Sequence, residues 1–186
     1  MRLTGGLDRG RKLRAPRGAT TRPTGAKVRE AMFNILGPAP EAAVLDVFAG
    51  TGALGIEALS RGASSASFIE RDGRALQALH RNLKDLGFAT RGRVLGTEAL
   101  AALRQLSTEG ARFGWVFIDP PYAAGLVASV LEVLSGGNLL ASGGIIIVEH
   151  DKRNVPPDSV AAIRLTDRRY YGDTGVSFYR SETGLS

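Results

Sequence analysis

The sequence predicts an α/β fold in which a mostly parallel, seven-stranded sheet ends in an antiparallel hairpin. Between residues 44 and 149, short apolar segments alternate with segments of helical periodicity, and this alternation is typical of β-α units. Between residues 163 and 180, two strand-like segments are joined by a short glycine-containing turn, with no helix between them. Strands joined by a short turn pair antiparallel, whereas parallel strands need a longer crossover.

The first strand and helix of this pattern enclose a glycine-rich turn. Residues 44–48 form an apolar strand, residues 53–59 have helix-forming composition, and Gly50, Gly52 and Gly55 have the spacing G-x-G-x-x-G. Such glycines let the backbone turn tightly and let a ligand approach it closely. The pattern alone fits either a dinucleotide or another adenosine-containing cofactor.

The remaining elements follow at regular intervals. We expect further strands over 66–70, 93–95, 113–118, 144–149, 163–171 and 176–180. We expect further helices over 74–86, 98–106 and 125–134. Ahead of the sheet, Thr24 is expected to cap a helix over 25–36, and residues 2–13 are expected to form a hairpin or extended pair.

Length and composition indicate one soluble globular protein. The 186 residues are enough for one substantial core, and the absence of cysteine excludes disulfides and thiolate metal sites. No apolar run approaches the roughly 20 residues of a membrane span, and the start, MRLTGGLDRG, lacks the apolar centre of a signal peptide. We therefore expect a cytoplasmic protein, with a monomer as the simplest oligomeric state.

Positive charge is concentrated at the amino terminus. Residues 1–29 carry nine basic side chains against one acid and are therefore +8, whereas residues 30–186 carry 15 basic and 17 acidic side chains and are −2. Glycines and prolines divide this basic segment into turns, and it runs directly into the first predicted helix. It is expected to bind the phosphates of RNA or DNA.

Two features favour S-adenosylmethionine over a dinucleotide. Asp46 lies in the first strand, four residues before Gly50, where a carboxylate would repel a pyrophosphate but would suit the ammonium group of the methionine moiety. Asp119-Pro120-Pro121-Tyr122 directly follows the apolar strand 113–118, and this arrangement is typical of enzymes that methylate an exocyclic amino group. Both features fall at strand ends, where open α/β sheets bind ligands.

Several segments of the chain together resemble one known family. They are RGRKL at 9–13, TRPT at 21–24, VREAMFN at 28–34, the stretch 45–63 that contains the glycines, ERD at 70–72, DPPY at 119–122 and YGDT at 171–174. These segments resemble the RsmD-type enzymes, which methylate the N2 amino group of a guanine in small-subunit (16S) ribosomal RNA. The amino-terminal segments carry this specificity, because DPPY is shared with many other amino methyltransferases.

The resemblance implies a Rossmann-like class I methyltransferase domain over 38–186, preceded by a basic RNA-binding extension over 1–37. It departs from the family at Lys27, which replaces an expected arginine, and at Glu98, where aspartate or asparagine commonly meets the adenine amino group. Small-subunit ribosomal RNA, free or within a ribosomal subunit, is the implied partner. The RNA contacts are assigned to Arg9, Arg11, Lys12 and Arg22.

Methylation of an exocyclic nitrogen assigns a role to each residue of DPPY. The Asp119 carboxylate and the Pro120 carbonyl are expected to accept from the N–H bonds of the guanine N2, on which positive charge develops during attack. The two prolines fix the backbone, and Tyr122 is expected to stack on a base flipped into the pocket. This chemistry requires no metal.

The cofactor is expected to contact the loops that follow three strands. Asp46 and the loop from Phe48 to Gly52 would hold the methionine moiety, Glu70 the ribose, and Glu98 and Ala99 the adenine. The full expected cofactor set is Asp46, Phe48, Ala49, Gly50, Thr51, Gly52, Glu70, Arg71, Glu98 and Ala99. Arg29 and Glu30 either brace this pocket or form a solvated pair. His150 is expected to be an exposed loop histidine, with contact to the substrate as the alternative.

Three other functions are weighed against guanine methylation. An adenine-N6 methyltransferase shares DPPY, but the chain offers only the basic extension for target recognition. A NAD-dependent oxidoreductase is disfavoured by Asp46 and by the terminal hairpin. A non-catalytic RNA-binding module is disfavoured because Asp46, the glycines and DPPY are all intact.

Overall fold

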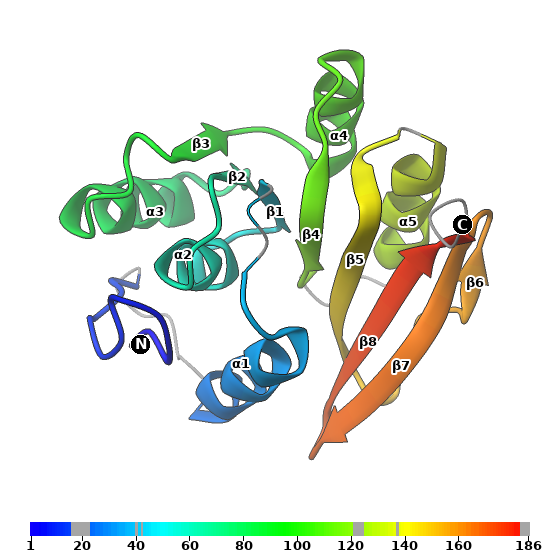
Figure 1. The fold of residues 1–186 in the computed structure, drawn as a ribbon, viewed down its shortest axis with the longest axis horizontal. Helices are drawn as coiled ribbons and strands as arrows, with labels where there is room; N and C mark the ends of the chain where they lie inside the picture. Colours follow the sequence, from blue (N-terminus) through cyan, green and yellow to red (C-terminus); the bar gives the residue numbers. More distant parts are fainter. Residues whose placement is uncertain (16–22, 40, 42, 121–124, 137, 183–186) are drawn as a thin grey trace.

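An eight-stranded sheet forms the middle layer of the molecule in a computed structural model of the chain (Figure 1). The structure describes residues 1–15, 23–39, 41, 43–120, 125–136 and 138–182. The strands are β1 (Val44–Val47), β2 (Ala66–Ile69), β3 (Gly92–Leu95), β4 (Phe113–Ile118), β5 (Leu140–Asp151), β6 (Ser159–Val160), β7 (Ile163–Tyr171) and β8 (Thr174–Ser181). Their order is β3-β2-β1-β4-β5-β8-β7-β6, with β1 to β5 parallel and β6 to β8 antiparallel.

Helices cover both faces of this sheet. They are α1 (Pro23–Leu36), α2 (Ala53–Ser60), α3 (Gly73–Asp85), α4 (Ala99–Thr108) and α5 (Leu126–Gly136). Side chains of α1, α2 and α3 pack in one apolar cluster, and those of α4 and α5 pack in a second cluster on the opposite face (Figure 1). The α/β fold with a carboxyl-terminal antiparallel hairpin is therefore confirmed. No helix within the described ranges combines the length and apolarity needed to cross a membrane.

The structure differs from the sequence-based expectations most clearly in one added strand and in the starts of α1 and β5. The two-residue strand β6 joins the edge of the sheet, so the sheet has eight strands instead of seven. Helix α1 begins at Pro23, so the prediction that Thr24 caps it is wrong. A proline suits the first helical turn because its missing N–H would have no partner there. Strand β5 begins at Leu140, four residues before its predicted start.

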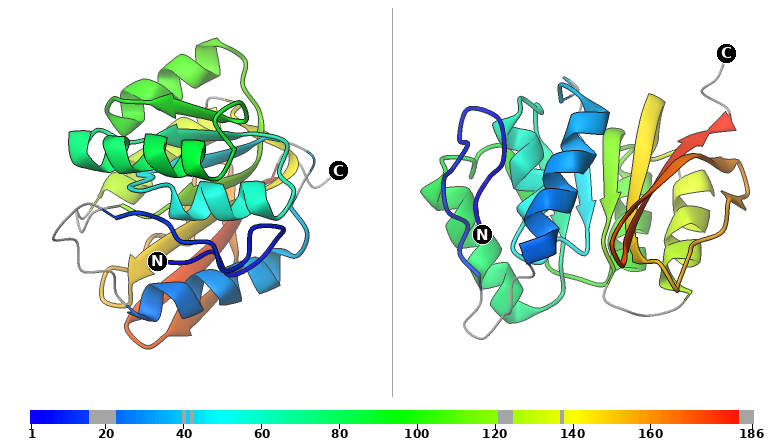
Figure 2. Two further views of the ribbon diagram at one scale, coloured as in Figure 1. Left: turned by 90° about the vertical axis from the view of Figure 1, so that its left-hand side faces the viewer. Right: turned by 90° about the horizontal axis from the view of Figure 1, so that it is seen from below.

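The amino-terminal extension shares the core of the rest of the chain. Residues 1–15 include an antiparallel bridge between Arg2 and Lys12, as the predicted hairpin requires. Leu3 and Leu13 of this hairpin are buried in the same cluster as side chains from α1 and α2. Figure 2 shows the hairpin lying against these two helices. Phe33 of α1 in turn contacts Trp115 of β4, with ring centroids 6.0 Å apart.

Candidate active site

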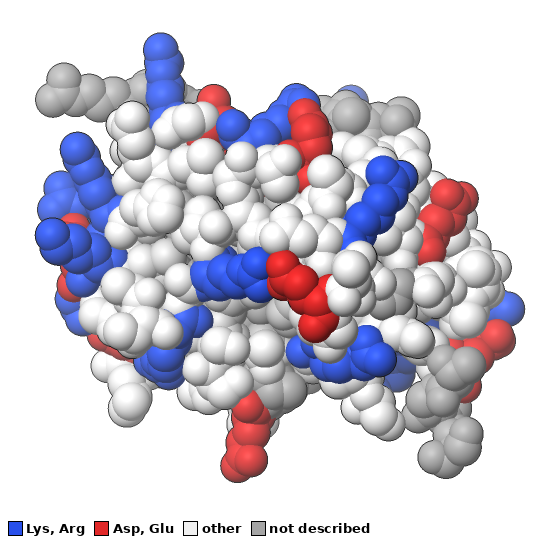
Figure 3. Space-filling view, turned by 90° about the horizontal axis from the view of Figure 1, so that it is seen from above, with Lys and Arg blue, Asp and Glu red and all other residues white. Residues whose placement is uncertain are grey.

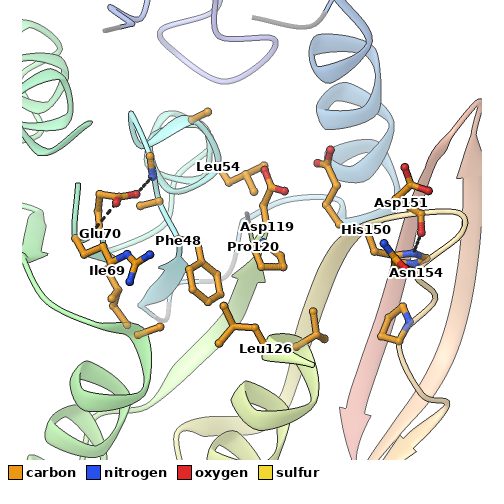
Figure 4. A pocket seen from close by; sticks show the side chains of 18 of the residues that line it. Phe48, Leu54, Ile69, Glu70, Asp119, Pro120, Leu126, His150, Asp151 and Asn154 are labelled. Atoms are coloured by element: carbon orange, nitrogen blue, oxygen red, sulfur yellow. Dashed lines mark hydrogen bonds between the residues drawn. The ribbon is translucent and has the colours of Figure 1, made fainter. Parts of the chain in front are cut away.

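A cleft opens where the parallel strands end, and its walls come from the segments that follow β1, β2, β3, β4 and β5 (Figure 4). Its volume is about 1830 Å³. The last residue of β1, Val47, pairs with Ile69 of β2 and with Ile118 of β4, so the three strands end at one level. The sheet therefore brings the glycine loop, Glu70 and Asp119 to one edge, as expected for an open α/β sheet.

The three glycines of the loop serve different structural needs. Gly52 has φ 84°, and a Cβ on it would lie 2.4 Å from a methyl carbon of Leu79, so it needs both the left-handed conformation and the space. A Cβ on Gly55 would lie 2.4 Å from the Phe68 ring, so this glycine allows α2 to pack closely on β2. Gly50 has φ 55° and open space beside it, so it serves the turn alone.

Phe48 has the least expected backbone conformation of the site. Its φ is 64°, although it is a bulky aromatic residue, for which the left-handed region is strained. The strain is of the order of 1–3 kcal/mol and is typical of ligand-binding segments. In Figure 4 the Phe48 side chain points into the cleft between the Glu70 side and the Asp119 side. The strained loop therefore presents an apolar ring to a ligand.

The loop donates its amide groups to carboxylates. Glu70 accepts from the Gly50 N–H at 2.8 Å and from the N–H groups of Arg71 and Asp72 at 2.7 Å each. Asp46 accepts from the Gly55 N–H at 2.8 Å. A dinucleotide fold aims such amides at a pyrophosphate instead. The arrangement therefore fits a ligand that carries a positive charge and no phosphate, and it argues against the dinucleotide alternative.

Asp46 lies behind the loop and is almost fully buried, at 2% exposure. Burial, reinforced by the negative charges of Asp119 and Glu70, raises the pKa of Asp46 to about 7, while the Gly55 N–H opposes the shift. Asp46 is not among the described residues that line the cleft. It holds the start of α2 against β1 through its bond from the Gly55 N–H.

We expect Asp46→Asn to remove a pH-dependent loss of stability. Because the pKa of Asp46 is raised from 3.8 to about 7, its contribution to stability is complete below pH 3.8 and is lost as the pH rises through about 7. The greatest possible slope is about 1.4 kcal/mol per pH unit. Urea unfolding at several pH values should show the variant gaining stability relative to wild type up to about pH 7. A constant difference across this range would contradict the raised pKa.

The expected adenine side of the cleft contains an ion pair. Arg71 follows β2, Glu98 precedes α4, and Arg71 Nη1 lies 2.6 Å from Glu98 Oε1. Both side chains are about two-thirds exposed, at 68% and 66%, and both line the cleft with the buried Ala99. The structure thus brings together the residues predicted for the adenine and shows that Glu98 also pairs with Arg71.

Asp119 and Pro120 line the centre of the cleft, immediately after β4. Asp119 is exposed to solvent, and Pro120 is half-buried. Figure 4 shows both between the Phe48 side and the Asp151 side of the cleft. Pro121 and Tyr122 lie outside the described residues, as does Arg22 of the extension, so their predicted roles stay predictions.

The other predicted RNA contacts lie away from the cleft walls. Arg9 and Lys12 are exposed on the amino-terminal hairpin. Arg11 is exposed but pairs with Asp8 at 2.8 Å and donates to the Asp85 carbonyl at the end of α3. Figure 3, viewed from the top of Figure 1, shows basic side chains gathered at the left margin, the side on which α3 and the hairpin lie.

Sequence reasoning missed the role of Glu57. This glutamate of α2 is fully buried and accepts from Thr4 N at 2.9 Å, from Arg61 Nε at 3.0 Å and from Arg29 Nε at 3.3 Å. Arg29, which also lines the cleft, therefore joins α1 to α2 and to the Arg2 carbonyl of the hairpin, whereas its neighbour Glu30 is solvated. A charged residue in the otherwise apolar helix segment ALGIEAL was the available signal.

Asn82 of α3 connects the hairpin to the glycine loop. Its side-chain amide accepts from Arg14 N at 2.7 Å and donates to the carbonyls of Arg14 at 3.1 Å and Thr51 at 2.9 Å. The asparagine is 1% exposed. Asn82 thus holds the basic extension to the glycine loop, and Glu57 holds it to α2.

His150 is a buried strand residue, so the expectation of an exposed loop histidine is wrong. Its Nε2 lies 2.9 Å from Ser177 Oγ, and its Nδ1 lies 3.0 Å from the Asp151 carbonyl. Gly175 of β8 makes room for the ring, because a Cβ there would lie 2.3 Å from it. Burial, together with the Arg168 charge, lowers the pKa of His150. The neutral ring therefore supports this end of the sheet.

Known proteins resemble the chain over almost its whole length. Residues 1–180 match the family described as Conserved hypothetical protein 95. The chain is 39% identical to Ribosomal RNA small subunit methyltransferase D of Escherichia coli, covering 98% of this chain and 90% of that protein, and 38% identical to YlbH of Bacillus subtilis, covering 97% and 98%. The solved structure of Escherichia coli yhhF superposes with a TM-score of 0.84, at 37% identity and 98% coverage of both chains.

Proposed function

Because the chain belongs to the RsmD family, we propose that it methylates small-subunit ribosomal RNA and that S-adenosylmethionine is the methyl donor. The acceptor is the exocyclic N2 amino group of a guanine, flipped into the pocket beside Asp119 and Pro120. The observation that supports this most directly is that one cleft is lined both by the glycine loop, which follows β1, and by Asp119-Pro120, which follow the neighbouring strand β4.

The residues present fit S-adenosylmethionine. The carboxylates of Glu70 and Asp119 line the cleft beside the glycine loop and favour a cationic ligand. Two N–H groups that a phosphate could use, those of Gly50 and Gly55, are bonded to carboxylates instead. The Phe48 ring offers an apolar contact. Glu70 uses three backbone donors but retains acceptor capacity for a ribose hydroxyl, since a carboxylate has about four lone-pair sites. Arg71, Glu98 and Ala99 would enclose the adenine.

The transfer itself is a displacement at the methyl carbon. When bound, S-adenosylmethionine would supply a methyl group on a sulfonium. The N2 lone pair would form the new N–C bond as the methyl–sulfur bond breaks with its electron pair left on sulfur, and N2 would then lose one proton. Asp119 and the Pro120 carbonyl, as acceptors, draw electron density toward N2 through its N–H bonds and orient its lone pair toward the methyl group. The nearby Asp119 carboxylate receives the departing proton or passes it to solvent. Alignment of the two reactants lowers the barrier further, by about 7–11 kcal/mol in favourable cases.

The labelled product identifies the reaction. Methyl-labelled S-adenosylmethionine is supplied with unmodified small ribosomal subunits, with free small-subunit RNA and with duplex DNA, and the nucleosides are separated after digestion. We expect label in N2-methylguanosine from the ribosomal substrates only. Label in N6-methyladenine would exclude guanine as the target, and wild-type protein that leaves every substrate unlabelled would exclude the proposed function.

A further inference from the structure

The cleft extends beyond the space that the cofactor and the target base require. It continues from Asp119 and Pro120 to the wall formed by the end of β5 and the segment after it, residues 151–157. Figure 4 shows Asp119 and Pro120 between Phe48 on one side and Asp151 and Asn154 on the other. Pockets for single small ligands occupy about 300–1,000 Å³. The volume of about 1830 Å³ leaves room for a further group of the substrate.

The 151–157 wall is held rigidly from behind by the carboxyl-terminal hairpin. Arg168 of β7 donates to the Pro156 carbonyl at 2.9 Å, and the buried Tyr179 of β8 donates to the Pro157 carbonyl at 3.0 Å. Lys152 N donates to the Asp173 carbonyl at 2.9 Å. These bonds come from strands that do not themselves carry the glycine loop or Asp119. The wall is therefore preorganised, and binding against it would lose little conformational entropy.

Arg153 presents a flat guanidinium on this wall. Its Nε and Nη2 bond separately to the two carboxylate oxygens of Asp151, each at 2.9 Å, and its backbone N–H bonds to the same carboxylate at 2.9 Å. The pair lowers the pKa of Asp151 well below its ordinary value. The two-point contact fixes the plane of the guanidinium, yet 79% of the Arg153 side chain remains exposed. A fixed, exposed guanidinium plane is a surface on which nucleobases stack.

The local charges favour a base over a phosphate. Arg153 is paired with Asp151, and Lys152 lies 2.5 Å from a carboxylate oxygen of Asp173. The two cations are therefore balanced by two acids, which weakens attraction for a phosphate, while 79% of the Arg153 side chain stays exposed for contact with a base. Val155 adds apolar surface, at 43% exposure, and Asn154 adds a side-chain amide that suits a base edge.

We propose that the 151–157 wall is a second nucleobase subsite, in which a base adjacent to the target guanine stacks on the guanidinium of Arg153. This inference rests on the proposed function, because it requires single-stranded RNA with one base at Asp119. The target and its neighbour then occupy opposite sides of Asp119-Pro120, and the neighbouring base helps to hold the strand open around the flipped guanine.

The test compares Arg153→Lys with Arg169→Lys. Arg169 is a matched control, since it pairs with Asp167, also two residues earlier, but lies outside the cleft walls. Each protein is given short single-stranded RNAs that contain the labelled guanine, with either a normal base or an abasic residue at each flanking position. With normal RNA, Arg153→Lys should raise KM about tenfold, whereas Arg169→Lys should match wild type. With the base missing at one flanking position, the KM of wild type should rise to that of Arg153→Lys, and the KM of the variant should not rise further.

Two outcomes would overturn the subsite. In the first, the KM of Arg153→Lys equals that of wild type on normal RNA. In the second, the substitution raises KM by the same factor on normal and on abasic RNA, as loss of a phosphate contact would. A binding measurement separates this inference from the proposed function: fluorescence anisotropy of end-labelled RNA, without any methyl transfer, should show wild type binding normal RNA about tenfold more tightly than abasic RNA, and Arg153→Lys binding both equally. Wild-type protein that leaves small ribosomal subunits and their free RNA unmethylated contradicts the proposed function, whereas wild-type protein that binds normal and abasic RNA equally contradicts the subsite.

Discussion

Asp119→Asn should lower the rate of methyl transfer about 10²- to 10⁴-fold, with a much smaller loss of S-adenosylmethionine affinity, since Glu70 still supplies negative charge beside the glycine loop. The substitution keeps the size of the side chain at the end of β4 but replaces one acceptor oxygen with a donor and removes the charge. The amide would present N–H groups toward the N–H groups of the substrate amine. Single-turnover rates with labelled cofactor, together with cofactor affinity from calorimetry, separate the two effects.

The control for this variant is Asp167→Asn. Asp167 is a solvent-accessible aspartate of β7 that lies outside the walls of the cleft, so its loss should leave the transfer rate unchanged. An Asp119→Asn enzyme that transfers methyl groups within about threefold of the wild-type rate would show that the carboxylate is not the acceptor. The Pro120 carbonyl and alignment of the reactants would then be the remaining contributions to examine.

Glu57→Ala should destabilise the protein by about 3–5 kcal/mol, the range for removing one partner of a buried ion pair. Glu57 is fully buried, and its removal would leave the guanidinium of Arg29, which is 3% exposed, without its carboxylate. The hairpin would also lose the hydrogen bonds that the Thr4 N–H and hydroxyl donate to Glu57. The free energy of unfolding from urea titration gives the size of the effect, and limited proteolysis reports loosening of the hairpin.

Two variants make this result specific. Glu132→Ala removes an exposed glutamate from α5 and should change stability little. Glu57→Gln keeps one acceptor oxygen in place and should fall between wild type and Glu57→Ala. A loss below about 1 kcal/mol for Glu57→Ala would show that the core relaxes around Arg29 and that the hairpin is held by Leu3 and Leu13 instead.

Local patterns were sufficient to predict most elements and the centre of the site. The alternation of apolar and amphipathic segments predicted β1 to β5 and their helices, because β1, β2 and β4 are buried on both faces and helices such as α3 and α4 on one. The strand-end positions of Gly50, Glu70 and Asp119 predicted that they would meet, since parallel strands end at one edge. Strand β6 was missed because two residues carry no periodicity.

Contacts between distant segments could not be predicted in this way. The sequence places nine basic residues before residue 30, but it does not show that Arg11 pairs with Asp8 and the end of α3, or that Arg29 turns inward to Glu57. Similarly, Glu98 stands at the expected strand end, yet its pairing with Arg71 depends on β2 and β3 being neighbours. Such pairings depend on which surfaces the fold brings together.

The sequence by itself determined the fold class, the family and the position of the glycine loop and Asp119, because periodicity, glycine spacing and strand-end motifs act over a few residues. Only the tertiary structure decided that Asp46 is sealed behind the loop, that Glu57 anchors the hairpin, and that Asp151 fixes Arg153 at the far wall of the cleft. Burial and ion pairing are set by the surroundings of a side chain, and these surroundings form only when the sheet and its helices assemble.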